Sequence, residues 1–497
     1  MEHVDVLILG AGLSGVGSAC HLGAKRPETS FAILEARDAI GGTWDLFRYP
    51  GIRSDSDMFT LGYSFEPWVG HKAIADGPSI LEYIRTTART HGIEDKVRFN
   101  RRAVSASWST PDARWTVEVE RTDTGAREVL TCGFLWGNTG YYRYDQGYRP
   151  DFPGEECFGG TLLHPQHWPE DLEWQGKRIV VIGSGATAVT LVPALALEAA
   201  HVTMLQRSPT YIVSIPGEDK VADSLRRHLP AQTAHAIIRW KNVLLTMFSF
   251  ELSRRAPDLV KKGIRKGVTE ALPKGYDVAS NFTPRYDPWD QRLCLVPDGD
   301  LFAAIKDGRA DVVTATIETF TPSGIRLTSG IELAADIVVT ATGLTMQLLG
   351  GITLDVDGTE VVPGETVAYK GIMLCGVPNM ATTFGYTNAS WTLKADLTAE
   401  YVCRLLDRMD SRSMRQCTPI PPNPGLPSEP FIDFSSGYVT RAAADFPKQG
   451  ATTPWRLHQN YLRDTWLLRF AKVDNALTLS NPVPAVSVAT TQAASTV

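Results

Sequence analysis

Short apolar runs that end in a turn recur along the chain, and they indicate its architecture. Examples are "DVLILG" at 5–10, "FAILEA" at 31–36, "RIVVIG" at 178–183 and "HVTMLQ" at 201–206. Apolar runs of about four to eight residues bounded by turn residues are typical of buried strands. Glycines directly after two of these runs indicate turns that lead into helices. We therefore predict an α/β fold with two Rossmann-like dinucleotide-binding domains.

The longest weakly charged run, 179–197, is long enough to suggest a membrane span. It contains Gly183, Gly185 and Pro193, however, and divides naturally into a strand, a turn and a helix. We therefore expect no transmembrane segment. The N-terminus enters a strand without the basic and apolar regions of a secretion signal, so a cytoplasmic protein is expected.

Size and charge narrow the possible partners. A chain of 497 residues exceeds what one hydrophobic core usually supports, so about two or three domains are expected. The formal net charge of −6 offers no basic surface to nucleic acid, which favours a small-molecule ligand. The seven cysteines are scattered without a Cys-x-x-Cys pair, so we expect neither a disulfide framework nor a metal site.

The first strand is followed by a complete dinucleotide-binding motif. Gly10, Gly12 and Gly15 lie between this strand and a helix, and Ser14 lies within the loop. The glycines allow a tight turn, close approach to a pyrophosphate and close packing of helix on strand. Glu35 ends the next strand, where a carboxylate can accept hydrogen bonds from a ribose 2′-hydroxyl. FAD or NAD is the predicted ligand.

The same motif returns in "IGSGATAV" as the G-x-G-x-x-A variant. Its residues are Gly183, Ser184, Gly185, Ala186, Thr187, Ala188 and Val189. At the end of the next strand the chain has Arg207 and Ser208 in place of an acidic residue. A guanidinium and a hydroxyl suit a 2′-phosphate, so NADPH is the predicted ligand. The alternative is that Arg207 is a solvated strand end.

Two later strands indicate where the chain crosses between domains. "FLWGNTG" ends at Thr139 and Gly140, and "ADIVVTATG" contains Asp336, Thr342 and Gly343. We expect the first part of a FAD domain at 1–150, a NADP domain at 151–334, and the second part of the FAD domain with a C-terminal loop and tail at 335–497.

The NADP domain is expected to carry a helical insertion at about 219–285. Within it, "VLLTMFSFEL" is apolar and "RRAPDLVKKGIRKG" is strongly basic. One interpretation is a helix that covers a substrate channel beside a solvated basic face. The other is peripheral contact with an anionic membrane.

Two longer motifs resemble those of the Baeyer–Villiger monooxygenases, a family of flavoprotein monooxygenases. "FGGTLLHPQHWP" fits the pattern F-x-G-x-x-x-H-x-x-x-W-P at Phe158, Gly160, His164, Trp168 and Pro169. "GGTWDLFRYPGIRSD" fits a second pattern at Gly41, Gly42, Trp44, Tyr49, Pro50, Gly51 and Asp55. The resemblance covers nearly the whole chain and is greatest to the ethionamide-activating type.

The resemblance implies a reaction and a set of cofactors. Members of the family use NADPH and FAD to insert one oxygen atom of O2 into ketones, giving esters or lactones, and they oxidise sulfides to sulfoxides. The oxygen is held as a peroxide on C4a of the reduced flavin. Arg292 matches the active-site arginine that stabilises this anion, and Asp55 matches the carboxylate that holds the arginine. Gln291 departs from the family, which often has a lysine there, so preference for NADPH would depend on Arg207 and Ser208.

Other site residues are also implied by the resemblance. The flavin and its loops are expected to contact Gly42, Thr43, Trp44, Asp45, Leu46, Arg53 and Ser54, and the backbone near Val104 is expected to contact adenine. Asn388 or Ser390 can cap a helix that points at the flavin. Trp455 either closes over the nicotinamide or packs in a loop.

Several alternatives remain open. His164 can be a general base, although we favour a structured hinge in which His164 and Trp168 lock the crossing between domains. The chain can instead be a flavin monooxygenase limited to sulfur or nitrogen oxygenation, or a FAD- and NADPH-binding redox sensor without a substrate. Neither the physiological ketone or sulfide nor the oligomeric state follows from the sequence.

Overall fold

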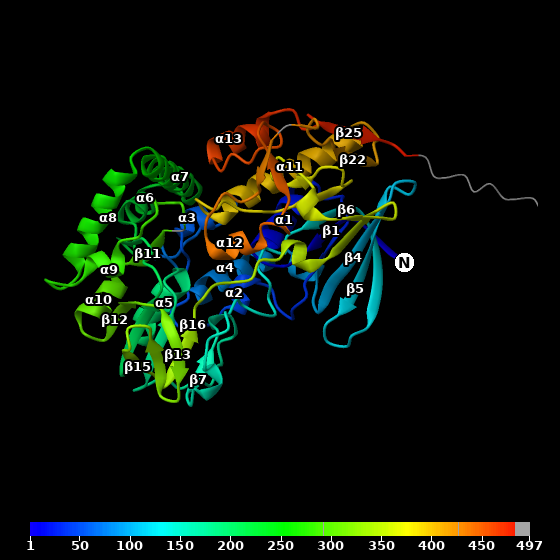
Figure 1. Cartoon of the computed structure of the whole chain (residues 1–497). Helices are drawn as coiled ribbons and strands as arrows, with labels where there is room; N and C mark the ends of the chain where they lie inside the picture. Colours follow the sequence, from blue (N-terminus) through cyan, green and yellow to red (C-terminus); the bar gives the residue numbers. More distant parts are fainter. Residues whose placement is uncertain (292, 426, 483–497) are drawn as a thin grey trace, which may run out of the picture.

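The structure is a computed structural model that describes residues 1–291, 293–425 and 427–482, and it contains two main sheets (Figure 1). The first has the order β18-β17-β4-β5-β6-β1-β2-β3, and β21 also pairs with β6. Its strands are β1 (Glu2–Leu9), β2 (Phe31–Leu34), β3 (Val97–Arg98), β4 (Arg101–Ser109), β5 (Arg114–Arg121), β6 (Arg127–Gly137), β17 (Thr353–Val356), β18 (Thr359–Val361) and β21 (Met380–Thr382). The first 137 residues and a segment more than 200 residues later therefore build one sheet.

Helices cover the parallel part of this sheet. They include α1 (Leu13–Lys25), α4 (Gly77–Thr90) and α11 (Trp391–Ser411), and α1 packs against both of the others. The last four residues of β1 are all buried, as expected for a central parallel strand covered on both faces. The apolar run of β1 was predicted to be a buried strand, and it forms one.

The second sheet is parallel throughout and has the order β12-β9-β8-β16-β7. Its strands are β7 (Thr161–Leu163), β8 (Arg178–Ile182), β9 (His201–Gln206), β12 (Ala310–Thr314) and β16 (Ile337–Thr340), with α5 (Ala186–Leu195) and α10 (Asp300–Lys306) beside them. A small antiparallel sheet, β13 (Ile317–Thr321), β14 (Gly324–Leu327) and β15 (Glu332–Ala334), follows β12.

The return to the first sheet comes later than the sequence suggested. The expected boundary before residue 335 would place 337–340 in the FAD domain, but β16 pairs with β7 and β8 of the second sheet. The apolar run "IVVT" completes that sheet, so the chain leaves it after Thr340.

Four helices occupy the predicted insertion interval. They are α6 (Lys220–His228), α7 (Ala231–Arg255), α8 (Pro257–Ala271) and α9 (Val278–Phe282), and the short parallel pair β10 (Ile212–Ile215) and β11 (Cys294–Pro297) flanks them. They lie together at the left of Figure 1. Within the described parts of the chain, no helix has the length and apolar character needed to cross a bilayer.

The remaining elements are short. They are α2 (Thr43–Leu46), α3 (Met58–Leu61), α12 (Gly437–Ala442), α13 (Tyr461–Thr465), the π-helix η6 (Trp466–Phe470), β19 (Ala368–Tyr369), β20 (Met373–Leu374), β22 (Gln416–Pro419), β23 (Ser428–Pro430), β24 (Lys448–Gly450), β25 (Leu477–Ser480) and five 3₁₀ turns, η1 (Glu94–Lys96), η2 (Glu155–Cys157), η3 (Pro165–His167), η4 (Leu348–Gly351) and η5 (Pro363–Glu365). In Figure 1, α13 lies between α7 and α11.

The two segments that cross between the sheets run side by side. Tyr148 N donates to Gly343 O at 3.0 Å, and Thr342 Oγ1 donates to Tyr148 O at 2.7 Å. Further along, Arg143 N donates to Thr345 O at 2.9 Å. The outgoing and returning connections therefore form a paired, hydrogen-bonded link.

Candidate functional site

A cavity of about 600 Å³ lies where the two sheets meet. Its walls come from the loop after β1, from α2 and the chain that follows it, from the crossing segments, from the start of α5 and from the start of α11. One cavity thus receives residues from the first glycine loop and from the helix that follows the second.

The first glycine loop has the geometry that its motif predicts. Gly10 has φ = +96°, and a Cβ there would lie 2.7 Å from Asn138 O. A Cβ on Gly15 would lie 1.8 Å from Gly10 O, so the helix can approach the strand only without a side chain. Gly12 precedes α1 and lines the cavity, which leaves its backbone open to a ligand.

Glu35 directly follows β2, lies beside this loop and also lines the cavity. Its carboxylate accepts from Ala11 N at 2.7 Å and from Arg37 N at 2.9 Å. Burial is the largest influence and raises the pKa of Glu35 in spite of these donors. Because a carboxylate has about four acceptor positions, two remain for a ligand hydroxyl. The loop and Glu35 therefore fit the ribose and pyrophosphate of FAD.

The second glycine loop is built in the same way. Gly183 has φ = +140°, and a Cβ there would lie 2.3 Å from Ala341 O. Ser184 Oγ donates to Ser208 O at 3.2 Å, which ties the loop to the end of β9. Arg207 and Ser208 are exposed there, outside the walls of the cavity.

The residues that follow this loop lie partly in the cavity wall and partly in the hydrophobic core. Ala186, Thr187 and Val189 line the cavity, whereas Ala188 is buried in the core of the second sheet. Gly183, Ser184 and Gly185 are not among the described residues that line the cavity.

Most of the residues expected near the flavin do line the cavity. They are Gly10, Gly12, Ser14, Glu35, Gly42, Thr43, Trp44, Arg53, Ser54 and Asp55. Arg53 also pairs with Asp300 of α10. Arg292, the expected catalytic arginine, lies outside the described residues.

Asp45 and Leu46 do not line the cavity within the described chain, contrary to expectation. The Asp45 carboxylate is buried and pairs with Arg37 at 2.5 Å and with Arg85 at 2.8 Å. A buried carboxylate needs such partners, and the pair with Arg85 holds it against α4.

The predicted contact at Val104 is displaced by a few residues. Arg101, Arg102 and Ala103 line the cavity, whereas the Val104 carbonyl accepts from Thr353 Oγ1 at 3.3 Å. The register of β4 shifts between Ala103 and Ser105, which changes the direction of the residues in between.

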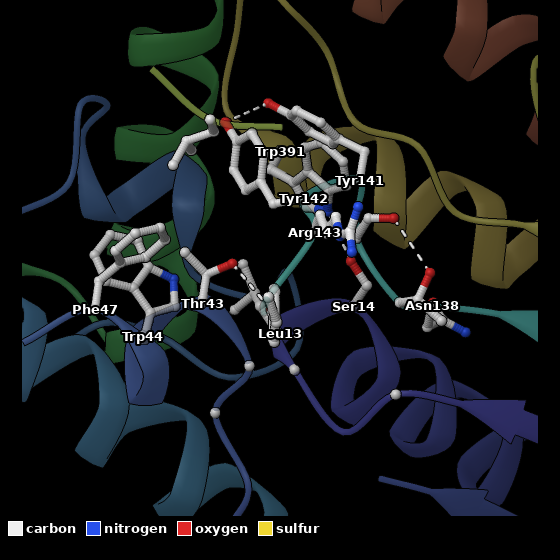
Figure 2. Close-up of a pocket in the computed structure, with 18 of the residues that line it drawn as sticks. Leu13, Ser14, Thr43, Trp44, Phe47, Asn138, Tyr141, Tyr142, Arg143 and Trp391 are labelled. Carbon is white, nitrogen blue, oxygen red and sulfur yellow. Dashed lines mark hydrogen bonds between the residues drawn. The ribbon is translucent and has the colours of Figure 1, made fainter. Parts of the chain in front are cut away.

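Trp44 was expected at the cavity, but the aromatic wall formed by Tyr141, Tyr142 and Trp391 was not predicted. Tyr141, Tyr142 and Trp391 group on one side of the cavity, and Thr43, Trp44 and Phe47 lie on another (Figure 2). The Tyr141 and Trp391 rings stack with centroids 5.1 Å apart, and Trp391 Nε1 donates to Ser14 Oγ at 2.7 Å. The sequence signal that could have indicated this wall is the position of Tyr141 and Tyr142, which directly follow the crossing segment that ends at Gly140.

Ser390 occupies the N-cap position of α11, but its side chain does not cap the helix. Its hydroxyl is 2.5 Å from Thr60 Oγ1. Asn388 Nδ2 instead donates to Gln459 O at 3.0 Å. The helix nevertheless begins at the cavity, because Ala389 and Trp391 line it.

Trp455 packs within the C-terminal loop. Its Nε1 donates to Ile420 O at 2.9 Å, and it is not among the described residues that line the cavity. This geometry favours the packing alternative over closure on a nicotinamide.

The predicted hinge at 158–169 lies beside the paired crossing segments. His164 Nε2 is 3.0 Å from Gly343 O, and a Cβ on Gly160 would lie 2.3 Å from Asp336 O. Phe158 packs edge-on against Phe320, and Trp168 against Trp174. Pro169 follows directly, and its carbonyl accepts from Leu172 N at 3.4 Å. None of these five residues is among those described as lining the cavity.

Two glycine loops, each between a parallel strand and a helix, with one cavity lined by the first loop and by the helix after the second, define a protein of the two-dinucleotide flavoprotein class. A model for an NAD(P)-binding Rossmann-like domain matches residues 8–69, and one described as flavin-binding monooxygenase-like matches 71–224.

Whole-length relatives identify the family. Over 475 residues the chain is 56% identical to FAD-containing monooxygenase EthA of Mycobacterium tuberculosis, covering 95% of this chain and 97% of that protein. EthA of Mycolicibacterium smegmatis is 54% identical over 474 residues, with 95% and 96% covered. The chain therefore belongs to the FAD-containing monooxygenases and is a flavoprotein monooxygenase.

The fold extends to more distant proteins. The solved structure of oxidized steroid monooxygenase bound to NADP matches with a TM-score of 0.75 at 19% identity, covering 96% of this chain and all of that one. At this level of identity the similarity concerns the fold alone.

Proposed function

We propose that the protein is a NADPH-consuming Baeyer–Villiger monooxygenase that converts ketones to esters or lactones and sulfides to sulfoxides, with O2 as co-substrate. The observation that carries the proposal is the single cavity lined both by the first glycine loop and by the start of α5, the helix that follows the second glycine loop. A nicotinamide bound at the second loop would then be close to a flavin bound at the first.

The proposal assigns the FAD site to the first sheet. Residues 1–150 and the chain after Thr340 would hold FAD, whose bound flavin supplies electron transfer and the activation of O2. Gly12 and the N-terminus of α1 would receive the pyrophosphate, and Glu35 the ribose. Trp44, Tyr141 and Trp391 would exclude water from the reacting end of the cavity, because their rings form its walls.

The second sheet would hold NADPH, with Ser184 and Thr187 near the phosphates and Arg207 and Ser208 at the 2′-phosphate. We propose Arg292 as the fixed cation at the site, since a guanidinium stays charged at neutral pH and stabilises a developing oxyanion. Asp55, which lines the cavity, would be its positioning residue.

Product analysis tests the reaction. The purified FAD-loaded protein is supplied with NADPH, a simple ketone and a thioether; an ester and a sulfoxide are expected. Arg292→Ala should abolish ester formation, and ester formation at the wild-type rate would contradict the mechanism. If the wild type forms the sulfoxide but no ester, the result would indicate a flavin monooxygenase that is limited to sulfur or nitrogen oxygenation. No product and no stimulation of NADPH oxidation would favour the redox sensor.

Arg207→Ala tests the cofactor preference. Removal of the guanidinium should raise the Michaelis constant for NADPH by roughly tenfold or more, because a charged hydrogen bond contributes about 1.5–3 kcal/mol. The constant for NADH should change little. Equal effects on the two nucleotides would contradict the assignment of the 2′-phosphate to Arg207.

We propose that the insertion covers the substrate side of a cytoplasmic enzyme. The exposed Trp240, Leu245 and Phe248 of α7 support peripheral membrane contact as a second possibility. Flotation with anionic vesicles separates the two interpretations. Salt-sensitive binding to the vesicles would favour peripheral membrane contact, and no such binding would favour an insertion that covers the substrate side and has a solvated basic face.

A further inference from the structure

A strained turn lies between α9 and β11, shortly before the proposed catalytic arginine in the sequence. Trp289 has φ = +72°, a left-handed backbone conformation that a bulky side chain rarely adopts. Such residues persist only where their surroundings hold them, and they cluster at functional sites. Arg292 is three residues further on, and Leu295 of β11 lines the main cavity. The turn at 287–290 therefore precedes the segment that leads to the cavity wall.

The turn is closed within itself by Asp290. Its backbone N donates to Asp287 O at 3.0 Å, and Asp287 N donates to the Asp290 carboxylate at 3.0 Å. Pro288 and Gln291 also form a β-bridge. These contacts fix the shape of the turn but not its place in the molecule, because all of them lie within five residues.

Helices of the insertion hold the turn in place. Arg254, in the last turn of α7, donates from Nη1 to the carboxylate of Asp290 at 2.7 Å. Phe250, one turn earlier on the same helix, packs edge-on against Trp289 with ring centroids 5.6 Å apart. Lys261 of α8 pairs with the first residue of the turn. The insertion therefore contacts the turn by charge and by ring packing.

The C-terminal part of the chain holds the same turn by its backbone. Ser435 donates twice to the Asp290 carbonyl, from N at 3.1 Å and from Oγ at 2.9 Å. Its neighbour Phe434 is buried in a cluster with Phe384, whose ring centroid lies 5.5 Å from that of Trp391 in the aromatic wall. Ser435 thus connects the turn to the wall of the cavity through a packed core.

The ion pair at the turn is partly exposed. The Arg254 and Asp290 side chains are 47% and 38% exposed, and ion pairs of this kind contribute little to global stability. Loss of the pair should therefore leave the protein folded and loosen the turn alone. A role in positioning can then be measured separately from a role in folding.

We propose that Arg254 and Ser435 are positioning residues for the proposed catalytic arginine. They place the strained turn from two separate parts of the chain, the helical insertion and the C-terminal segment. This inference rests on the proposed function. Ester formation needs a fixed cation beside a developing oxyanion, whereas oxidation of a sulfide forms no such oxyanion. Ester formation should therefore be the reaction that depends on Arg254 and Ser435.

Hydrogen–deuterium exchange measures the hold on the turn without turnover. In the oxidised FAD-loaded protein, peptide 286–291 should exchange roughly two- to fivefold faster in Arg254→Ala than in the wild type, which is the scale of one partly exposed ion pair. Ser435→Ala loses one of two hydrogen bonds and should act in the same direction. Arg254→Lys keeps the charge and should restore most of the protection. Arg255→Ala is the matched control, because Arg255 is the next residue of α7 and pairs with Glu251 instead.

Product ratios measure the consequence for the reaction. With NADPH, a simple ketone and a thioether, Arg254→Ala and Ser435→Ala should each lower the ester formed per NADPH consumed by roughly two- to tenfold, since small displacements at a reacting group are costly. The sulfoxide formed per NADPH and the Michaelis constant for NADPH should change little. Arg255→Ala should keep the wild-type ratio of ester to sulfoxide.

The outcomes separate this inference from the proposed function. If exchange at the turn rises in Arg254→Ala but the wild type forms no ester, the proposed function fails and the hold on the turn stands. Wild-type exchange in both Arg254→Ala and Ser435→Ala would overturn the inference, as would faster exchange with an unchanged ratio of ester to sulfoxide. An equal loss of ester in Arg255→Ala would also overturn it, because any charge lost at the end of α7 would then have the same effect.

Discussion

At the scale of single residues, His164 shows how a residue that resembles a catalytic base is used in a hinge. Its Nδ1 accepts from Gln166 N at 3.1 Å, so the ring proton lies on Nε2 and donates to Gly343 O. Burial lowers the pKa of His164. The ring is therefore a neutral link between the hinge and the returning crossing segment.

The hinge should weaken on acidification. Since the folded pKa of His164 is below the unfolded value of 6.5, its contribution to stability is complete above pH 6.5 and decreases as the pH falls from there toward the folded pKa. Protonation would also place a second donor against Gln166 N. The melting temperature of wild type should therefore fall more steeply below pH 6.5 than that of His164→Gln.

Above pH 6.5, the free energy of unfolding of His164→Gln should be about 1–2 kcal/mol lower than that of the wild type, because its hydrogen bonds are weaker. His167→Gln is the control, because His167 is exposed on the same segment. Equal pH slopes for wild type and His164→Gln, measured by thermal unfolding, would show that His164 does not titrate with folding.

At the scale of secondary structure, α7 is held to the first sheet's helices by a buried charge. The Arg239 guanidinium contacts Asp396 and three carbonyls in and next to α3, and Asp396 also contacts His21 of α1 at 3.2 Å. The insertion thus packs on elements that belong to the other half of the molecule.

Arg239→Met should destabilise the protein by about 3–5 kcal/mol, because Asp396 would remain buried with one partner fewer. Lys241→Met is the control on the same helix. Lys241 pairs with Asp219 in a partly exposed position, and the loss should be about 0–1 kcal/mol. The free energy of unfolding in urea measures both, and similar losses would contradict a special role for Arg239.

The sequence predicts elements well where the signal is local. Both glycine loops, the crossing strands and the helical insertion follow from adjacent residues, and the structure places them in those intervals. The aromatic wall depends on Ser14 and Trp391, which are 377 residues apart in the sequence and meet only after folding. Likewise, nothing near Asp45 indicates that Arg85 will hold its carboxylate against α4.

At the scale of the whole molecule, one close contact between the two halves lies at a glycine. Gly51 has φ = +76°, and a Cβ there would lie 2.7 Å from the Ala194 Cβ and 2.8 Å from Thr190 O, both on α5. The chain after α2 therefore reaches the second sheet's first helix only because residue 51 has no side chain.

Gly51→Ala should push the two halves apart, lower the FAD content of the purified protein and cost at least about 1–3 kcal/mol. Gly176→Ala is matched for backbone strain, with φ = +67°, but its Cβ would meet nothing within 4 Å. It should lose stability without losing FAD. Equal flavin absorbance per chain in both variants would contradict a structural role at the interface.

The shared first sheet also has a consequence for synthesis on the ribosome. When the nascent chain has emerged as far as Thr340, the second sheet has all of its strands, whereas β17, β18 and β21 of the first are still untranslated or inside the tunnel. Pairing between segments so far apart is slow to form. The nucleotide fold encoded in the middle of the gene can therefore mature first, and the half that begins at the N-terminus must wait for the last third of the message.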